Sequence, residues 1–211
     1  MSASYHQFVF DVERRAFMGD FEGMYRAELA QGFDSWHQED LRHFDKRVCL
    51  ELLADYNFCD VLDIGCGKGA FTQFLKRRNN RVVAVDISAT ALAVAQTRFP
   101  DIEFKLADVT AAEFQATTLA ATCTKEGKFD LTVCLETLSY VPQWEQLLGQ
   151  FAQASRHALI GLYLPENPIG FVKNAKDLVA AFEHHFEIIE AVDLPYRRKT
   201  ILFGKVKPCP T

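Results

Sequence analysis

Two apolar runs separated by a glycine-rich turn constrain the fold of this chain more than any other feature. The first run and its turn read VLDIGCGKG at residues 61–69, and the second run reads VVAVDIS at residues 82–88. Both runs are short and apolar at successive positions, which is typical of strands covered by helices on both faces. The glycines predict a tight strand-to-helix turn, because glycine adopts positive φ without strain. Together these features predict a β–α–β unit with parallel strands.

The rest of the chain continues this alternation of strands and helices. Strands are expected at residues 60–64, 81–86, 102–106, 129–135, 158–164, 186–192 and 200–206. Helices are expected at residues 44–56, 70–78, 89–98, 143–155 and 177–184. The last two strands are joined by LPYRRK, which is too short for a helical crossover and favours an antiparallel pair. We therefore expect an α/β, Rossmann-like fold: a seven-stranded, mostly parallel sheet with its last strand antiparallel and helices on both faces.

Composition narrows the class of protein further. Hydrophobic residues make up 49% of the 211 residues, enough for one sizeable core, and the net charge of −5 argues against a nucleic-acid partner. The six cysteines show no CxxC pair or zinc-site spacing, so no metal is expected, and they suit a reducing compartment. The N-terminus has no signal-peptide pattern, and no apolar stretch approaches the length of a membrane span. We expect a cytoplasmic protein, monomeric or homodimeric.

An acidic residue at the end of the second run indicates what the glycine turn binds. Asp86 follows Gly67 by 19 residues (86 − 67), where an acid can accept hydrogen bonds from ribose hydroxyls at the topological switch point of the sheet. The spacing is G-x-G-x-G, although Ala70 also permits the G-x-G-x-x-A form of a dinucleotide site. Lys68 does not complete a GxxxxGK[ST] phosphate loop, and we expect it to be exposed. The pattern predicts a nucleoside-containing cofactor.

Four segments, in order and at the usual spacing, resemble the signatures of the class I S-adenosylmethionine-dependent methyltransferases. These segments are DVLDIGCGKGAF at 60–71, VVAVDIS at 82–88, LADV at 106–109 and FDLTVCLETLSYV at 129–141. The resemblance covers about residues 44–207. It implies that residues 44–211 form the S-adenosylmethionine-binding domain, and that the aromatic and acidic residues 1–43 form an N-terminal helical lid on the substrate side.

The resemblance also implies which residues bind the cofactor, S-adenosylmethionine, and its product S-adenosylhomocysteine. Transferred by position, the binding residues are Asp63, Gly65, Cys66, Gly67, Asp86, Ile87, Asp108, Val109 and Leu135. In this assignment Asp86 holds the ribose hydroxyls, Asp108 accepts from the adenine amino group, and the Leu135 carbonyl faces the ammonium. Asp63 orients the turn and reaches the ammonium through water.

Candidate catalytic and substrate residues lie beyond the fourth signature and in the lid. Glu136 is the first candidate for a general base, the alternative being a solvated strand-end carboxylate. Tyr140 stands where many relatives carry a histidine, and it is a candidate for substrate contact. In the lid, Trp36 is either an aromatic face near the sulfonium or a packing residue. His37 is the second candidate base, the alternative being a capping or surface histidine.

The implied reaction is transfer of a methyl group to an oxygen or nitrogen atom of a small metabolite. LETL stands after the fourth strand where enzymes that methylate the exocyclic amine of a base usually carry N/D-P-P-Y/F/W. The displacement is in line, and a base is needed only when the nucleophile carries a proton. Two alternatives stay open at this point: an oxidoreductase using an NAD-type cofactor, and a non-catalytic partner protein that binds S-adenosylmethionine.

Overall fold

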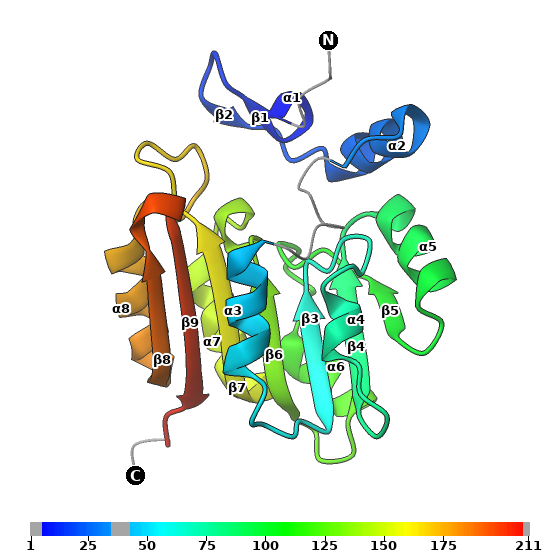
Figure 1. The fold of residues 1–211 in the computed structure, drawn as a ribbon, viewed down its shortest axis with the longest axis vertical. Helices are drawn as coiled ribbons and strands as arrows, with labels where there is room; N and C mark the ends of the chain where they lie inside the picture. The colour runs from blue at the N-terminus through cyan, green and yellow to red at the C-terminus, as the bar shows by residue number, and fades with distance from the viewer. Residues whose placement is uncertain (1–5, 35–42, 209–211) are drawn as a thin grey trace.

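The structure is a computed structural model that describes residues 6–34 and 43–208. Figure 1 shows a central sheet with helices on both faces and an N-terminal segment beyond one edge. The strands are β1 (Phe10–Asp11), β2 (Ala16–Phe17), β3 (Asp60–Ile64), β4 (Arg81–Asp86), β5 (Glu103–Leu106), β6 (Phe129–Leu135), β7 (Ser155–Tyr163), β8 (Phe186–Leu194) and β9 (Lys199–Val206). The α-helices are α1 (His6–Val9), α2 (Phe21–Gln31), α3 (Phe44–Leu52), α4 (Thr72–Leu75), α5 (Ala89–Arg98), α6 (Ala116–Cys123), α7 (Trp144–Ala154) and α8 (Ala175–His185). Two 3-10 turns, η1 (Leu138–Tyr140) and η2 (Pro195–Arg197), complete the elements.

The described residues form a seven-stranded sheet in the order β5-β4-β3-β6-β7-β9-β8. Strand β3 lies parallel to both β4 and β6, and β7 continues the parallel set next to β6. Strand β9 runs antiparallel to both of its neighbours, β7 and β8. This arrangement confirms the predicted Rossmann-like sheet with its last strand antiparallel.

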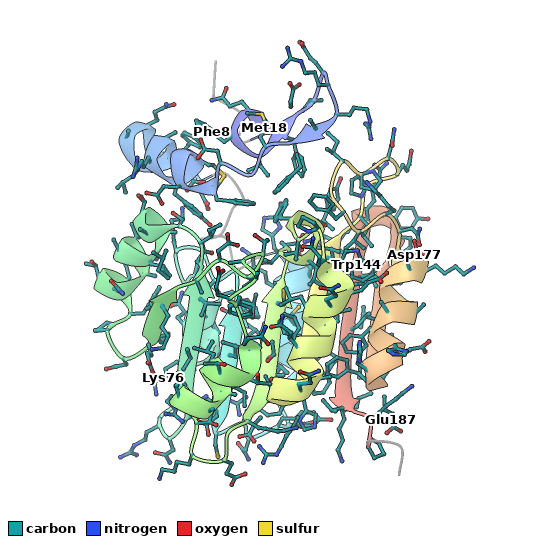
Figure 2. The ribbon with its side chains drawn as sticks, turned by 180° about the vertical axis from the view of Figure 1, so that it is seen from behind. Phe8, Met18, Lys76, Trp144, Asp177 and Glu187 are labelled. Carbon is teal, nitrogen blue, oxygen red and sulfur yellow. The ribbon has the colours of Figure 1, made fainter. Side chains whose placement is uncertain are left out.

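The two faces of the sheet are covered by different helices because successive residues of a strand point to opposite faces. Leu62 and Ile64 of β3 pack with residues of α6, α7 and α8, whereas Val61 packs with residues of α3, α4 and α5. Trp144 on α7 belongs to the first of these two cores, and Figure 2 shows it on that face. The continuous apolar runs of the sequence are thus explained by burial on both faces.

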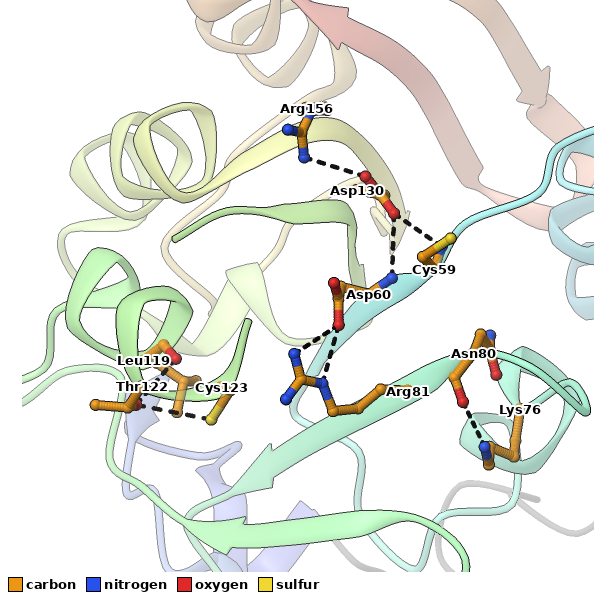
Figure 3. Close-up of polar contacts among 10 residues, drawn as sticks. All are labelled: Cys59, Asp60, Lys76, Asn80, Arg81, Leu119, Thr122, Cys123, Asp130 and Arg156. Atoms are coloured by element: carbon orange, nitrogen blue, oxygen red, sulfur yellow. Dashed lines mark hydrogen bonds and ion pairs between the residues drawn. The ribbon is translucent and has the colours of Figure 1, made fainter. Parts of the chain in front are cut away.

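The amino ends of the parallel strands are joined by charged side chains (Figure 3). Asp130, at the start of β6, accepts hydrogen bonds from the backbone N–H groups of Cys59 and Asp60 at 2.8 and 3.1 Å. Arg156 of β7 donates to the same carboxylate at 3.1 Å. Arg81 of β4 pairs with the Asp60 carboxylate at 2.8 Å. These contacts stabilise the amino edge of the sheet, which is opposite the carboxyl edge of the parallel strands.

The N-terminal segment is not wholly helical, which corrects the expectation for residues 1–43. Between α1 and α2, Phe10 pairs with Phe17 in the antiparallel hairpin β1–β2, and Arg15 adopts a left-handed φ of 50°. Each strand has two residues, too few to show a sequence period. Helix α2 begins after Asp20, whose side chain accepts from the Gly23 N–H, and ends at Gly32 in a left-handed conformation.

Helix α4 is much shorter than the helix predicted for residues 70–78. It ends at Leu75, and Lys76 is already extended. The reason is Asn80, whose side chain accepts from the Arg77 N–H at 2.7 Å and donates to the Leu75 carbonyl at 2.8 Å. An asparagine that bonds these backbone groups replaces the contacts that would continue a helix.

Candidate active site

A cavity of about 490 Å³ lies along the carboxyl edge of the parallel strands. The chain runs from β3 outward through β4 to β5 and then crosses to β6 on the other side of β3. This reversal is the topological switch point, where open α/β sheets bind ligands. The N-terminal segment lies beyond the same edge (Figure 1), and Phe21 and Tyr25 of α2 line the cavity.

The glycine turn after β3 is conformationally restricted to glycine. Gly65, Gly67 and Gly69 all have positive φ, between 54° and 74°. A Cβ on Gly65 would also lie 2.0 Å from the Thr137 hydroxyl, which comes from the turn after β6. Gly65 therefore permits both the backbone reversal and the close approach of two loops at the cavity.

Asp63 is the most deeply buried acid of the cavity lining, with 4% of its surface exposed. The Thr72 hydroxyl donates to it at 2.6 Å. Burial, with a contribution from nearby Asp86, raises the pKa of Asp63 to about 7, against the opposing effect of the Thr72 hydrogen bond.

Asp86 ends β4 and is held by backbone donors from two loops. One carboxylate oxygen accepts from the Gly67 N–H at 2.7 Å, and the other accepts from the Ser88 N–H at 2.9 Å. Burial raises the pKa of Asp86, although these backbone hydrogen bonds oppose the rise. The acid thus ties the glycine turn to the N-terminus of α5.

All the predicted cofactor residues except Gly67 line this cavity. Those that line it are Asp63, Gly65, Cys66, Asp86, Ile87, Asp108, Val109 and Leu135. Gly67 does not line the cavity, but its N–H donates a hydrogen bond to Asp86, which does. Asp108 accepts from the N–H and hydroxyl of Thr110, at 2.8 and 2.7 Å. Ile87 is 42% exposed, so an apolar ligand surface has room to cover it.

Glu136 lies in the cavity wall but its carboxylate is already engaged. Its φ is 63°, a left-handed conformation that costs a non-glycine residue free energy and is found most often at functional sites. The Tyr163 N–H donates to one carboxylate oxygen at 2.9 Å, and Lys199 forms an ion pair with the other. Asp45 of α3 pairs with the same Lys199 at 3.1 Å.

Sequence reasoning missed the lysine and the second acid of this wall. Burial alone would lower the pKa of Lys199, but Glu136 and Asp45 outweigh it and raise that pKa. Lys199 and Glu136 lie 63 positions apart and come together only through the pairing of β7 with β9. No short motif contains such a contact. The RRK run at 197–199 marks a basic segment but does not indicate where it lies.

Tyr140, the predicted substrate residue, lines the cavity and joins the N-terminal segment to η1. Its ring lies 5.1 to 6.1 Å, between centroids, from the rings of Phe10, Phe17 and Phe21. Trp36 and His37, the other two candidates, lie outside the described residues.

Lys68 contradicts its expected exposure. Its side chain is only 13% exposed, and its ammonium lies 3.1 Å from Glu28 and 3.3 Å from Asp34. The residue sits in the glycine turn, so the ion pairs connect this turn to α2 and the segment that follows it.

Residues 6–34 and 43–208 contain neither a metal-binding cluster nor a membrane-spanning helix. No group of three or more His, Cys, Asp or Glu side chains there is placed to hold a metal ion. No helix in those residues is long and apolar enough to cross a membrane.

Comparison with known proteins gives a consistent family. Residues 61–157 match the methyltransferase domain family. The chain is 32% identical over 97 residues to a ubiquinone biosynthesis O-methyltransferase of Azoarcus sp., covering 46% of this chain and 39% of that protein. It is 31% identical over 121 residues to nodulation protein S of Azorhizobium caulinodans, covering 55% and 53%. The matched segments span 31% to 53% of the length of such curated relatives.

Solved structures agree with this result at the level of the fold. The N-methyltransferase NodS of Bradyrhizobium japonicum WM9, solved in complex with S-adenosyl-L-homocysteine, matches with a TM-score of 0.69 and 20% identity. The match covers 89% of this chain and 98% of that one. Residues 61–157 are thus similar to the methyltransferase domain family, and the sheet has the fold of a solved methyltransferase.

Proposed function

We propose that the chain binds S-adenosylmethionine in this cavity and transfers its methyl group to an oxygen or nitrogen atom of a small molecule. The observation that carries the proposal is the set of three acids, Asp63, Asp86 and Asp108, that line one cavity next to the Gly65 turn. They lie at or near the carboxyl ends of the neighbouring strands β3, β4 and β5. The similarity of residues 61–157 to the methyltransferase domain family supports the same function and disfavours the NAD-type alternative.

The chemistry of the cavity suits the cofactor part by part. Each oxygen of Asp86 accepts one backbone N–H and keeps acceptor capacity for a ribose hydroxyl. Asp108 and the exposed Ile87 side chain line the same cavity, which supports our assignment of the adenine to these two residues. At the other end, Asp63 and the Leu135 carbonyl favour the ammonium. The acids also suit the positive sulfonium, because opposite charges attract strongly where water is excluded.

Catalysis would rest mainly on positioning the acceptor in line with the methyl group and excluding water. Glu136 remains the candidate base for a nucleophile that carries a proton, but it would act while bound to Lys199 and the Tyr163 N–H. The carboxylate oxygens have lone pairs beyond these two contacts. His37 remains a candidate from the sequence alone.

The acceptor is proposed as a small molecule because it would share the cavity of about 490 Å³ with the cofactor. The names of the relatives include both an O-methyltransferase and an N-methyltransferase, so both acceptor atoms stay in the proposal. We further propose that residues 44–211 form the cofactor domain. The segment 1–43, with Tyr140, would cover the acceptor.

Thermal denaturation with separate ligands tests the proposal. S-adenosylmethionine or S-adenosylhomocysteine at 100 times its Kd should stabilise the protein by about 2.7 kcal/mol. NAD at the same concentration should give no comparable shift. A larger shift with NAD, or none with either adenosyl ligand, would reject the proposal. Adding methyl-labelled S-adenosylmethionine with candidate acceptors then separates an enzyme from a non-catalytic binding protein.

Asp86→Ala should abolish the S-adenosylhomocysteine shift because it removes both proposed ribose acceptors. Asp86→Asn keeps the side-chain size and should still weaken binding by roughly tenfold or more, the effect of losing a charge-assisted hydrogen bond. Asp193→Ala, at an exposed position of β8, is the matched control and should bind normally. Unchanged affinity in both Asp86 variants would show that the ribose assignment is wrong.

A further inference from the structure

Helix α2 is joined to the cofactor end of the cavity by a carboxylate at its N-terminal end. Glu22 accepts hydrogen bonds from the Ser88 and Thr90 hydroxyls, both at 2.6 Å, and from the Thr90 N–H at 3.1 Å. These three donors stand at the N-terminus of α5, directly after Asp86. A carboxylate there is stabilised by the helix dipole as well as by the hydrogen bonds.

A second contact, toward the other end of α2, involves the glycine turn. Lys68 pairs with Glu28 of α2 at 3.1 Å and with Asp34 beyond it at 3.3 Å. Glu28 is 3% exposed, so this ion pair is largely shielded from water. Shielded pairs are screened less by salt than surface pairs and cost more to break.

Between these two contacts α2 covers part of the cavity. Phe21 and Tyr25, one turn apart on α2, line the cavity together with Asp86 and Ile87. Glu22 and Lys68 are not themselves lining residues. Their direct contacts are with α2, the residues that follow it and the N-terminal end of α5, although the charge of Glu22 also raises the pKa of Asp86.

We propose that Glu22 and Lys68 are positioning residues that form a two-point latch, holding α2 across the ribose end of the cavity. The inference rests on the proposed binding of an adenosyl cofactor. Bound cofactor then leaves at the rate at which α2 detaches from both points. The contacts at the other end of the cavity are of another kind, because there the N-terminal segment meets Tyr140 through aromatic rings.

The carboxylate of Glu22 stays ionised at neutral pH. Hydrogen bonds from Ser88 and Thr90 hold the pKa of Glu22 at about 2. Its carboxylate is therefore ionised throughout the neutral range. A change of pH within the neutral range should therefore leave the Glu22 contact intact.

Hydrogen exchange on the ligand-free protein tests the latch without any cofactor. Glu22→Gln and Lys68→Met should each increase amide exchange across residues 21–31, while the sheet amides stay protected. Lys207→Met removes an exposed lysine at the opposite edge of the sheet and should leave α2 unchanged. Wild-type protection of residues 21–31 in both latch variants would overturn the proposal, whatever the protein binds.

Release of labelled S-adenosylhomocysteine, chased with excess unlabelled ligand, tests the consequence. Each latch variant should release it about tenfold faster than wild type, as expected for loss of charge-assisted hydrogen bonds. Lys68→Arg should restore most of the slow release, since it keeps the charge.

The two proposals fail in different ways. Wild-type protein that binds no S-adenosylhomocysteine rejects the proposed function, and the exchange experiment still decides whether the latch contacts hold α2. Wild-type binding with equal release rates in wild type, Glu22→Gln and Lys68→Met rejects the latch and leaves the proposed function standing.

Discussion

At the scale of single residues, the cavity is defined by buried acids that the sequence motifs predicted to lie together. Asp86 was assigned from its spacing to the glycines and Asp63 from the family resemblance, and both line the cavity. The motif could not show what each acid contacts in the ligand-free protein. The Thr72 hydroxyl donates to Asp63, and the Gly67 and Ser88 N–H groups donate to Asp86, so both acids are held by groups of the protein itself.

Asp63 should make stability depend on pH in a direction opposite to that of most acids. Its pKa in the folded protein, about 7, lies above its ordinary value of 3.8. Between these values the folded state binds more protons than the unfolded state, so stability falls as pH rises. The slope approaches about 1.4 kcal/mol per pH unit and ends above pH 7. Asp63→Asn should remove it.

Urea unfolding of both proteins from pH 5 to pH 8 measures this effect. The free energy of unfolding of Asp63→Asn, minus that of wild type, should increase with pH across this range. Asn accepts the Thr72 hydroxyl as Asp does, so the hydrogen bond is matched. A difference that stays flat with pH would show that Asp63 is already ionised at pH 5.

At the scale of elements, strands β3, β4 and β6 could be predicted from the sequence with their bounds, because apolar runs buried on both faces leave a strong signal. The hairpin β1–β2 and the short α4 could not. The hairpin has too few residues for a period, and α4 is ended by the side chain of Asn80. The Asp45–Lys199–Glu136 wall was also missed, because it joins α3, β6 and β9 across long sequence distances.

Lys199→Met should destabilise the protein because it leaves two carboxylates facing each other without their shared cation. Lys199 and Asp45 side chains are both 16% exposed. Loss of one partner from a largely buried pair costs about 3 kcal/mol, which the partial exposure reduces to roughly 2 kcal/mol. Chemical denaturation measures the loss, and adding Asp45→Asn should recover part of it. Lys205→Met, exposed on the same strand, is the control and should change stability little.

A Lys199→Met protein as stable as Lys205→Met would mean that the ion pairs contribute nothing net. The left-handed backbone of Glu136 would then be held by the Tyr163 N–H and by the hydrogen bond from its own N–H to the Gly161 carbonyl. In that case Glu136 would still be available as a base, and its pairing with Lys199 would be incidental to its position.

At the scale of the whole molecule, the sheet places one cavity where its strand order reverses, and the N-terminal segment meets that edge from outside (Figure 1). The mostly parallel sheet with its antiparallel last strand follows from the alternation of strands and helices and from the short last connection. The contacts of the N-terminal segment do not, because Glu22 and Lys68 carry no motif and find their partners only in the folded chain. The sequence accordingly predicts the methyl donor better than the acceptor.

A crystal structure with S-adenosylhomocysteine tests the central claim most directly, namely that this cavity is the methyl-donor site. We expect the ribose hydroxyls on Asp86, the adenine beside Ile87 and Asp108, and the amino-acid end near Asp63 and the Leu135 carbonyl. The sulfur should point along the cavity toward Tyr140 and Glu136. A ligand bound outside the cavity, or inside it with the ribose away from Asp86, would contradict the account.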